Sequence, residues 1–136
     1  MKPKKLESVI IVEDSAVQRS MIKDHLAKYS GLKIMEYSSG NACVKELILG
    51  NVKQPDLILM DYFLDSNFSG SADGLDSLTK IKEICPDTSV IMHTSVDNEK
   101  IIELARKKGA LDYIVKGRTG FDELDSTLKK HFSLKN

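Results

Sequence analysis

Short apolar runs alternate with longer amphipathic segments along the whole chain. Five of these runs are rich in apolar residues and are bounded by polar or turn-forming positions. Runs of this length and composition are typical of strands buried in a parallel sheet. The predicted strands are Ser8–Glu13, Leu32–Tyr37, Asp56–Asp61, Ser89–Ser95 and Leu111–Val115.

Between these strands, apolar residues recur every three or four positions, which is the period of a helix with one buried face. The predicted helices are Ser15–Tyr29, Gly40–Leu49, one from Asp73 or Gly74 to about Ile84, Asn98–Lys108, and a last one presenting Phe121, Leu124, Leu128 and Phe132. The expected buried positions include Val17, Met21, Ile22, Leu26 and Tyr29 in the first helix, Val44, Leu47 and Ile48 in the second, and Ile101, Ile102, Leu104 and Ala105 in the fourth. Ser15 or Asp14 can cap the first helix.

Alternation of five strands with five helices predicts an α/β fold. Short strand–helix–strand units favour right-handed crossovers, and these build a parallel, doubly wound sheet with helices on both faces. The chain has 136 residues, which suits one compact domain. No internal repeat or linker interrupts the pattern.

Polar side chains follow four of the predicted strands, at the point where each strand ends. They are Glu13-Asp14, Asp61, Thr94-Ser95 and Lys116. Parallel strands share one direction, so these groups meet at the carboxyl edge of the sheet, where open α/β sheets bind ligands.

This grouping predicts a metal site with an acceptor for phosphorus. The carboxylates of Glu13, Asp14 and Asp61 would repel one another without a cation, and oxygen ligands suit Mg2+. An Asp beside a bound cation can act as a nucleophile toward phosphorus. Lys116 offers an ammonium and Thr94 a hydroxyl to the phosphoryl group.

Composition and charge exclude several other classes of protein. The chain is 41% hydrophobic and 29% charged, with a formal net charge of zero, so direct binding to nucleic acid is not expected. No apolar stretch approaches a membrane span, and no signal peptide follows the basic residues Met1–Lys5, so we expect a cytoplasmic protein without a membrane partner. The two cysteines, Cys43 and Cys85, lack metal-ligand spacing and are expected to be free thiols.

The residues at the strand ends closely resemble those of the receiver domain of two-component response regulators, which has the chemotaxis-regulator fold. The matching pieces are Val12-Glu13-Asp14, Met60-Asp61, Asp73-Gly74-Leu75, His93-Thr94-Ser95, Gly109-Ala110 and Tyr113-Ile114-Val115-Lys116. The resemblance implies a flavodoxin-like sheet of five parallel strands in the order 2-1-3-4-5, with five helices. It also implies that residues 1–136 form a single receiver domain with a core from about Leu6 to Phe132.

The resemblance also implies a function. Asp61 would take a phosphoryl group from a histidine kinase or a histidine phosphotransfer protein, with Lys116 and Thr94 assisting. Asp14 and Asp61 would bind Mg2+ directly, Glu13 through water, and the backbone carbonyl of Phe63 would be a further ligand.

In that family the output comes from a conformational switch. Thr94 and Tyr113 would form the switch pair, although Tyr113 could instead be a half-buried strand tyrosine without that role. Output would come from binding an unidentified protein target, from onward phosphate relay, or from a phosphorylation-dependent homodimer. The chain would not be an enzyme beyond its own phosphoryl transfer and slow dephosphorylation.

Two features depart from the family pattern. The loop Tyr62–Ala72 is long and has no proline, and Gly117 rather than proline follows Lys116. In receivers, the side chains two positions after the phosphorylated Asp and two after the switch hydroxyl flank the path of the hydrolytic water. Here these are Phe63 and Val96, both apolar, so we expect a long-lived phosphorylated form.

Three alternatives remain at this stage. The chain could be a receiver excised from a hybrid kinase or larger regulator rather than a stand-alone domain. It could be a phosphatase-type hydrolase with an Asp nucleophile, of the haloacid dehalogenase type, but Phe63 occupies the position of the general acid in such enzymes. A flavodoxin-like cofactor binder would need a phosphate-cradling loop where Glu13-Asp14 stands.

Overall fold

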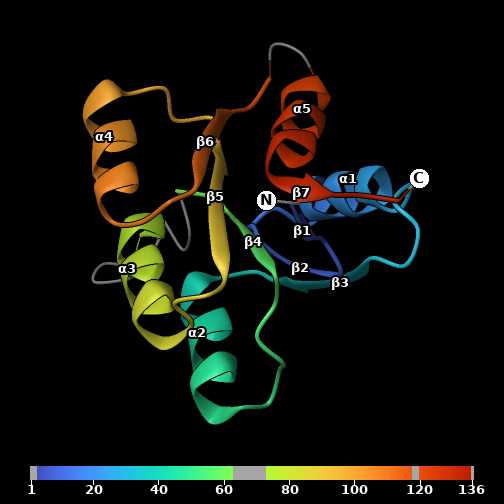
Figure 1. Cartoon of the computed structure of the whole chain (residues 1–136). Helices are drawn as coiled ribbons and strands as arrows, with labels where there is room; N and C mark the ends of the chain where they lie inside the picture. The colour runs from blue at the N-terminus through green and yellow to red at the C-terminus, as the bar shows by residue number, and fades with distance from the viewer. Residues whose placement is uncertain (1–2, 63–72, 118–119, 136) are drawn as a thin grey trace.

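A parallel sheet forms the centre of the molecule (Figure 1). The computed structural model describes residues 3–62, 73–117 and 120–135. Within these residues the main sheet has five strands in the order β3-β2-β4-β5-β6, all paired in parallel. The strands are β2 (Ser8–Val12), β3 (Lys33–Tyr37), β4 (Leu57–Met60), β5 (Ser89–Thr94) and β6 (Asp112–Val115). Counted along the main sheet alone, this is the predicted order 2-1-3-4-5.

Five helices of the described residues cover the two faces of this sheet. They are α1 (Ala16–Leu26), α2 (Gly40–Leu49), α3 (Gly74–Ile84), α4 (Glu99–Lys107) and α5 (Asp122–His131). Helices α1 and α5 contribute to one core cluster and α2, α3 and α4 to the other. The predicted flavodoxin-like, doubly wound fold is therefore confirmed.

Strand β4 is buried on both faces because it lies in the middle of the sheet. Leu57 and Leu59 belong to the core beneath α1 and α5. Ile58 and Met60 point the other way, into the core beneath α2 and α3. This explains why an uninterrupted apolar run, rather than an alternating one, precedes Asp61.

The start of α1 and the end of α2 follow the capping rules. The hydroxyl of Ser15 accepts a hydrogen bond from the backbone N–H of Gln18, so Ser15 rather than Asp14 caps α1. Gly50 ends α2 with a positive φ of 69°, a conformation that costs glycine little. The carboxylate of Asp14 is therefore not used to cap α1.

Some helix positions predicted to be buried are exposed. Val17 is 69% exposed, Met21 53%, Ile48 63% and Leu104 45%. A helix lying on one face of a sheet buries a limited stripe, and in α1 the residues within that stripe are Ile22 and Leu26. The periodicity predicted the helices correctly but made their buried faces too wide.

The sequence pattern did not predict a second, small sheet. Strand β1 (Lys4–Lys5) pairs in parallel with β7 (Phe132–Ser133), and the N–H of Leu6 donates to the carbonyl of Ser133 at 3.0 Å. This pairing ties the two ends of the described chain together. Among the described residues, no helix is long and apolar enough to cross a bilayer.

Candidate phosphoacceptor and metal site

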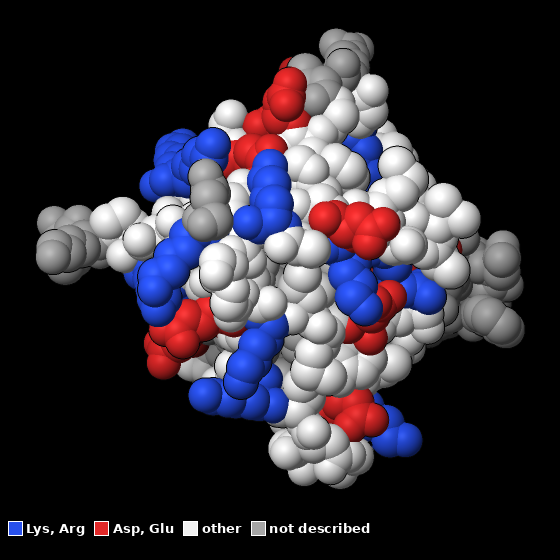
Figure 2. Space-filling view, turned by 90° about the vertical axis from the view of Figure 1, so that its right-hand side faces the viewer, with Lys and Arg blue, Asp and Glu red and all other residues white. Residues whose placement is uncertain are grey.

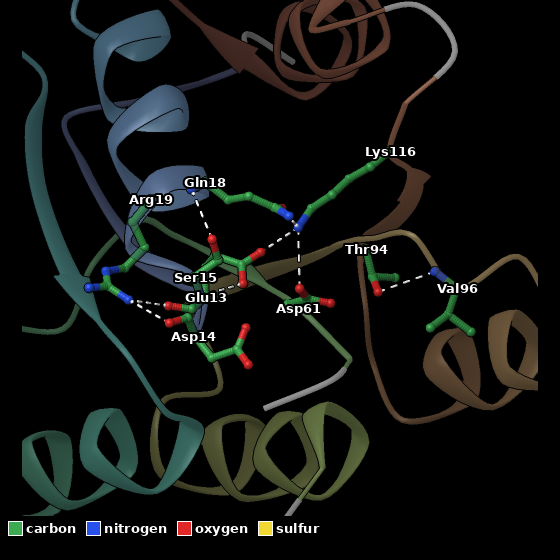
Figure 3. Close-up of polar contacts among 9 residues, drawn as sticks. All are labelled: Glu13, Asp14, Ser15, Gln18, Arg19, Asp61, Thr94, Val96 and Lys116. Carbon is green, nitrogen blue, oxygen red and sulfur yellow. Dashed lines mark hydrogen bonds and ion pairs between the residues drawn. The ribbon is translucent and has the colours of Figure 1, made fainter. Parts of the chain in front are cut away.

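The register of the sheet brings the predicted site residues to one edge. Val12 is paired with Met60, Met60 with Met92, and Thr94 with Val115. The residues that follow these strand ends, or close them, therefore gather in one place. Figure 3 shows Glu13, Asp14, Asp61, Thr94 and Lys116 around a common centre.

Three carboxylates form the acidic part of this site. Glu13, Asp14 and Asp61 each offer one oxygen, and these oxygens lie within 4.8 Å of one another. Glu13 and Asp61 are buried, whereas Asp14 is exposed. A cluster of hard oxygen ligands, open to solvent on one side, suits Mg2+, which keeps several of its waters.

The backbone carrying these carboxylates is held on several sides. The N–H of Asp61 donates to the carbonyl of Val12 at 3.1 Å, which extends the β2–β4 pairing beyond the strands. The guanidinium of Arg19 donates to the carbonyls of Glu13 at 2.7 Å and Asp14 at 3.2 Å. These contacts fix the turn from β2 into α1 and therefore the positions of two carboxylates.

The environment of Asp61 disfavours the ionised form of its carboxyl group. Burial raises its pKa, and a hydrogen bond with Glu13 raises it further. A hydrogen bond with Thr94 and the positive charge of Lys116 act in the opposite direction but do not cancel the effect. A cation at the site would relieve this cost, since opposite charge favours the ionised carboxyl.

Lys116 provides the positive charge. Its backbone N–H donates to the carbonyl of Thr94 at 2.9 Å, which continues the β5–β6 pairing. Its ammonium contacts a carboxylate oxygen of Glu13 and lies 3.2 Å from Oδ2 of Asp61. It also donates to Oε1 of Gln18 at 2.5 Å, a contact that the sequence analysis did not foresee.

Thr94 and Tyr113 are connected through the backbone of Val96. Thr94 is fully buried, and its hydroxyl accepts a hydrogen bond from the N–H of Val96 at 3.3 Å. The hydroxyl of Tyr113 donates to the carbonyl of Val96 at 2.6 Å. Burial and then the charge of Asp61 raise the pKa of Tyr113 to about 12, so its phenol stays protonated.

His93 packs on the opposite side of β5 from the Met92 core. The ring is 4% exposed, and its Nδ1 has no hydrogen-bond partner among the described residues. Burial and then the positive charge of Lys116 lower its pKa to about 4. The ring is therefore neutral near pH 7, as expected for a packed core imidazole.

A cavity of about 390 Å3 lies beside Lys116, between α1 and the start of α5. Its lining residues are mostly apolar and include Met21, Ile22, His93 and Phe121. Gln18, Ser95 and Lys116 are also lining residues. Lys116 therefore belongs both to the acidic site and to the lining of this cavity.

Capping and close packing at the start of α3 explain why an aspartate and a glycine occupy positions 73 and 74. The carboxylate of Asp73 caps α3 by accepting from the N–H groups of Leu75 and Asp76. A Cβ added to Gly74 would lie 2.3 Å from the carbonyl oxygen of Asp61, which is too close for any side chain. The start of α3 thus packs directly against the backbone that carries Asp61.

The predicted metal contact of Phe63 lies outside the described residues, as does most of the loop that begins after Tyr62. The contact therefore stays a prediction.

Comparison with known proteins identifies the family. The sequence profile of the response regulator receiver domain matches residues 9–129. The chain belongs to this family of two-component signalling domains, whose members are phosphoacceptor switches.

Individual relatives agree with the profile. The chain is 32% identical over 108 residues to the chemotaxis protein CheY of Bacillus subtilis, covering 79% of this chain and 83% of that protein. It is 30% identical over 122 residues to the response regulator protein VraR of Staphylococcus aureus, covering 89% of this chain and 54% of VraR. The chain thus spans about half the length of that larger relative.

Solved structures show the same fold. The response regulator domain of Thermotoga maritima CheB superposes with a TM-score of 0.76 at 26% identity, covering 93% of this chain and 96% of that one. The response regulator TrrA of the same organism, solved in complex with Mg2+-BeF, superposes with a TM-score of 0.75 at 24% identity, covering 93% and 100%.

Proposed function

We propose that Asp61 accepts a phosphoryl group in a Mg2+-dependent reaction, and that the donor is a phosphohistidine of a histidine kinase or a histidine phosphotransfer protein. The observation that carries this proposal is the position of the Asp61 carboxylate between the acidic cluster and the Lys116 ammonium. A metal ion beside Asp61 would reduce the repulsion between its carboxylate and the phosphoryl oxygens, and the Lys116 ammonium would stabilise the negative charge on those oxygens.

The proposed metal ligands are the carboxylates of Asp14 and Asp61, with Glu13 acting through water and the Phe63 carbonyl completing the set. When bound, Mg2+ would neutralise charge on the incoming phosphoryl oxygens. The Asp61 oxygen attacks phosphorus in line, the bond from phosphorus to the donor imidazole breaks, and that imidazole takes up a proton. Lys116 and the Thr94 hydroxyl then donate hydrogen bonds to the phosphoryl oxygens.

The output follows from the link between Thr94 and Tyr113. Movement of Thr94 toward the phosphoryl group breaks its hydrogen bond with the Val96 N–H, and the Val96 carbonyl also holds Tyr113. Tyr113 then repacks and alters the surface formed by α4, β6 and α5. A target protein reads this surface, or the phosphoryl group is relayed onward, or two phosphorylated copies pair.

We further propose that residues 1–136 form a single receiver domain with a core from about Leu6 to Phe132, and that it works in the cytoplasm. It would act as a switch and would have no substrate beyond its own phosphoryl group. The rival is a phosphatase-type hydrolase that uses Asp61 as its nucleophile.

Labelling experiments separate these two functions. A receiver incubated with radiolabelled acetyl phosphate and Mg2+ should retain one label, and hydroxylamine should remove that label because it is an acyl phosphate. A hydrolase should instead release phosphate from p-nitrophenyl phosphate with many turnovers and retain little label. Turnover of p-nitrophenyl phosphate that disappears in Asp61→Asn would contradict the switch and support the hydrolase.

A further inference from the structure

The ammonium of Lys116 has a third oxygen partner besides the two carboxylates of the site. Oε1 of Gln18 accepts from it at 2.5 Å, across 98 residues of sequence. Figure 3 shows the Gln18 side chain reaching from the first turn of α1 and the Lys116 side chain reaching from the end of β6 until they meet. Gln18 carries no charge, so this contact differs in kind from the two ion pairs.

A glycine follows Lys116, in a backbone conformation that other residues rarely adopt. The next residue, Gly117, has a φ of +114°, and a Cβ built there would meet no described atom within 4 Å. The lysine stem itself has four rotatable bonds. The Lys116 side chain is only 15% exposed, so packing along its stem and the contacts at its charged end together place the ammonium.

The position of Gln18 is itself fixed by the turn that carries Glu13. The N–H of Ser15 donates to Oε2 of Glu13 at 3.0 Å, and the Ser15 hydroxyl accepts from the N–H of Gln18 at 3.2 Å. Gln18 and Glu13 both bind Lys116, so the hydrogen bonds form a closed ring. The helix cap thus sets Gln18 in place to receive the ammonium.

We propose that Gln18 is a positioning residue, which holds the Lys116 ammonium beside Asp61 through its side-chain carbonyl. This inference rests on the proposed function. A neutral acceptor suits the task because it orients the ammonium without competing for it as a carboxylate would. The ammonium can then shift to the phosphoryl oxygens when Asp61 is phosphorylated.

The substitution Gln18→Met tests this role because it keeps the length of the side chain and removes the strong acceptor. We expect phosphorylation by acetyl phosphate with Mg2+, followed by intact mass, to slow about three- to tenfold, as misplacement of a catalytic group does. Ser20→Met is the matched control, since Ser20 is an exposed residue of the same helix. It should react at the wild-type rate.

A double-mutant cycle with Lys116→Met shows whether Gln18 acts through the lysine. Without the ammonium, Gln18→Met should cause no further slowing. A wild-type rate in Gln18→Met, or equal slowing in both backgrounds, would overturn the inference. If wild type itself takes up no phosphate, the proposed function fails instead.

A spectroscopic measurement tests the contact without any phosphorylation. A lysine ammonium gives a side-chain 1H–15N NMR signal when hydrogen bonds slow its exchange with water. The Lys116 signal should be present in wild type and in Ser20→Met, and broadened or lost in Gln18→Met. An unchanged signal in Gln18→Met would also overturn the positioning role, even where Lys116→Met reacts too slowly to complete the cycle.

Discussion

At the scale of single residues, Asp61 lowers the stability of the metal-free protein near neutral pH. Its pKa is raised in the folded state, chiefly by burial and then by Glu13. A carboxyl whose folded pKa lies above its unfolded pKa binds protons more tightly in the folded state. The folded state therefore gains stability as the pH falls through that raised pKa, and it bears the cost of the charge above it.

We accordingly predict that Asp61→Asn stabilises the protein at pH 7 without Mg2+. The gain should be on the order of 0.5–2 kcal/mol, the usual range for stabilising substitutions, measured by urea unfolding. Adding Mg2+ should stabilise wild type more than the variant. The difference between their free energies of unfolding should therefore narrow or change sign. Asp24→Asn, an exposed acid on α1, is the control. A wild type that is more stable than Asp61→Asn without metal would contradict this account of the site.

His93 predicts the opposite pH dependence. Its folded pKa of about 4 lies below the ordinary value of 6.5, so the unfolded chain protonates first as the pH falls. Stability should therefore be lost between about pH 6.5 and 4, at up to about 1.4 kcal/mol per pH unit for one proton. His93→Leu should show a shallower loss over the same window in urea unfolding. Parallel curves for the two proteins would refute the assignment.

The proximity of the candidate site residues could be predicted because each follows or closes a parallel strand, and parallel strands end at one edge. Glu13, Asp61 and Lys116 needed only the strand boundaries to be brought together. Gln18 could not be predicted, because its contact depends on the helix cap and on one side-chain conformation. The exposure of Val17 shows the same limit, since periodicity does not give the width of a buried face.

At the scale of elements, the start of α3 supports the strand end that carries Asp61. The N–H of Gly74 donates to the carbonyl of Tyr62 at 2.9 Å, and the close approach of Gly74 to the Asp61 carbonyl leaves no space for a methyl group. Both contacts involve backbone atoms that cannot rotate away. The position of α3 and the position of Asp61 are therefore linked.

Gly74→Ala should therefore harm both stability and metal binding. Forcing a methyl group into this contact typically costs about 1–3 kcal/mol. We expect that loss in urea unfolding, together with weaker Mg2+ binding by calorimetry because Asp61 is displaced. Ser126→Ala, at an exposed position in α5, should change neither. If Gly74→Ala were destabilised but bound Mg2+ as tightly as wild type, the position of α3 would not control the position of Asp61.

Most elements could be predicted from periodicity and caps, and the pairing of the two ends could not. Strands β1 and β7 have two residues each, which is too short to show any alternation. Their pairing depends on where α5 ends in space. The sequence pattern also did not predict a second contact between distant elements. Asp125 of α5 binds His25 in α1 and Lys28 and Tyr29 just after it.

At the scale of the whole molecule, the lifetime of a phosphorylated form would decide how long the proposed switch stays on. The side chain of Val96 is partly exposed beside the buried Thr94. An apolar side chain there cannot hydrogen-bond a water and orient it toward phosphorus. Phe63 should act in the same way, although it lies outside the described residues.

Val96→Glu should therefore speed phosphate loss, by about tenfold if the carboxylate orients the attacking water. The rate is measured on protein phosphorylated with acetyl phosphate, after removal of the donor, with Mg2+ present and no kinase or phosphatase. Val96→Leu, which stays apolar, should lose phosphate at the wild-type rate. Equal rates of phosphate loss in wild type and Val96→Glu would show that Val96 does not control this step. The loop after Tyr62 would then be the next candidate.

In the view of Figure 2, acidic and basic side chains are interspersed. The formal net charge of zero agrees with this, so long-range attraction is not expected to select partners. Recognition of a kinase and of a target should instead depend on local shape and on the state of Asp61.

The most direct test of this account is the intact mass of the protein after incubation with acetyl phosphate. With Mg2+, the mass of wild type should rise by one phosphoryl group, and the addition should be absent when the metal is chelated. Asp61→Asn should remain unmodified, whereas Asp65→Asn, which alters an acid about four positions further along the sequence, should be labelled like wild type. Labelling of Asp61→Asn to the wild-type extent would show that the phosphoryl group goes elsewhere.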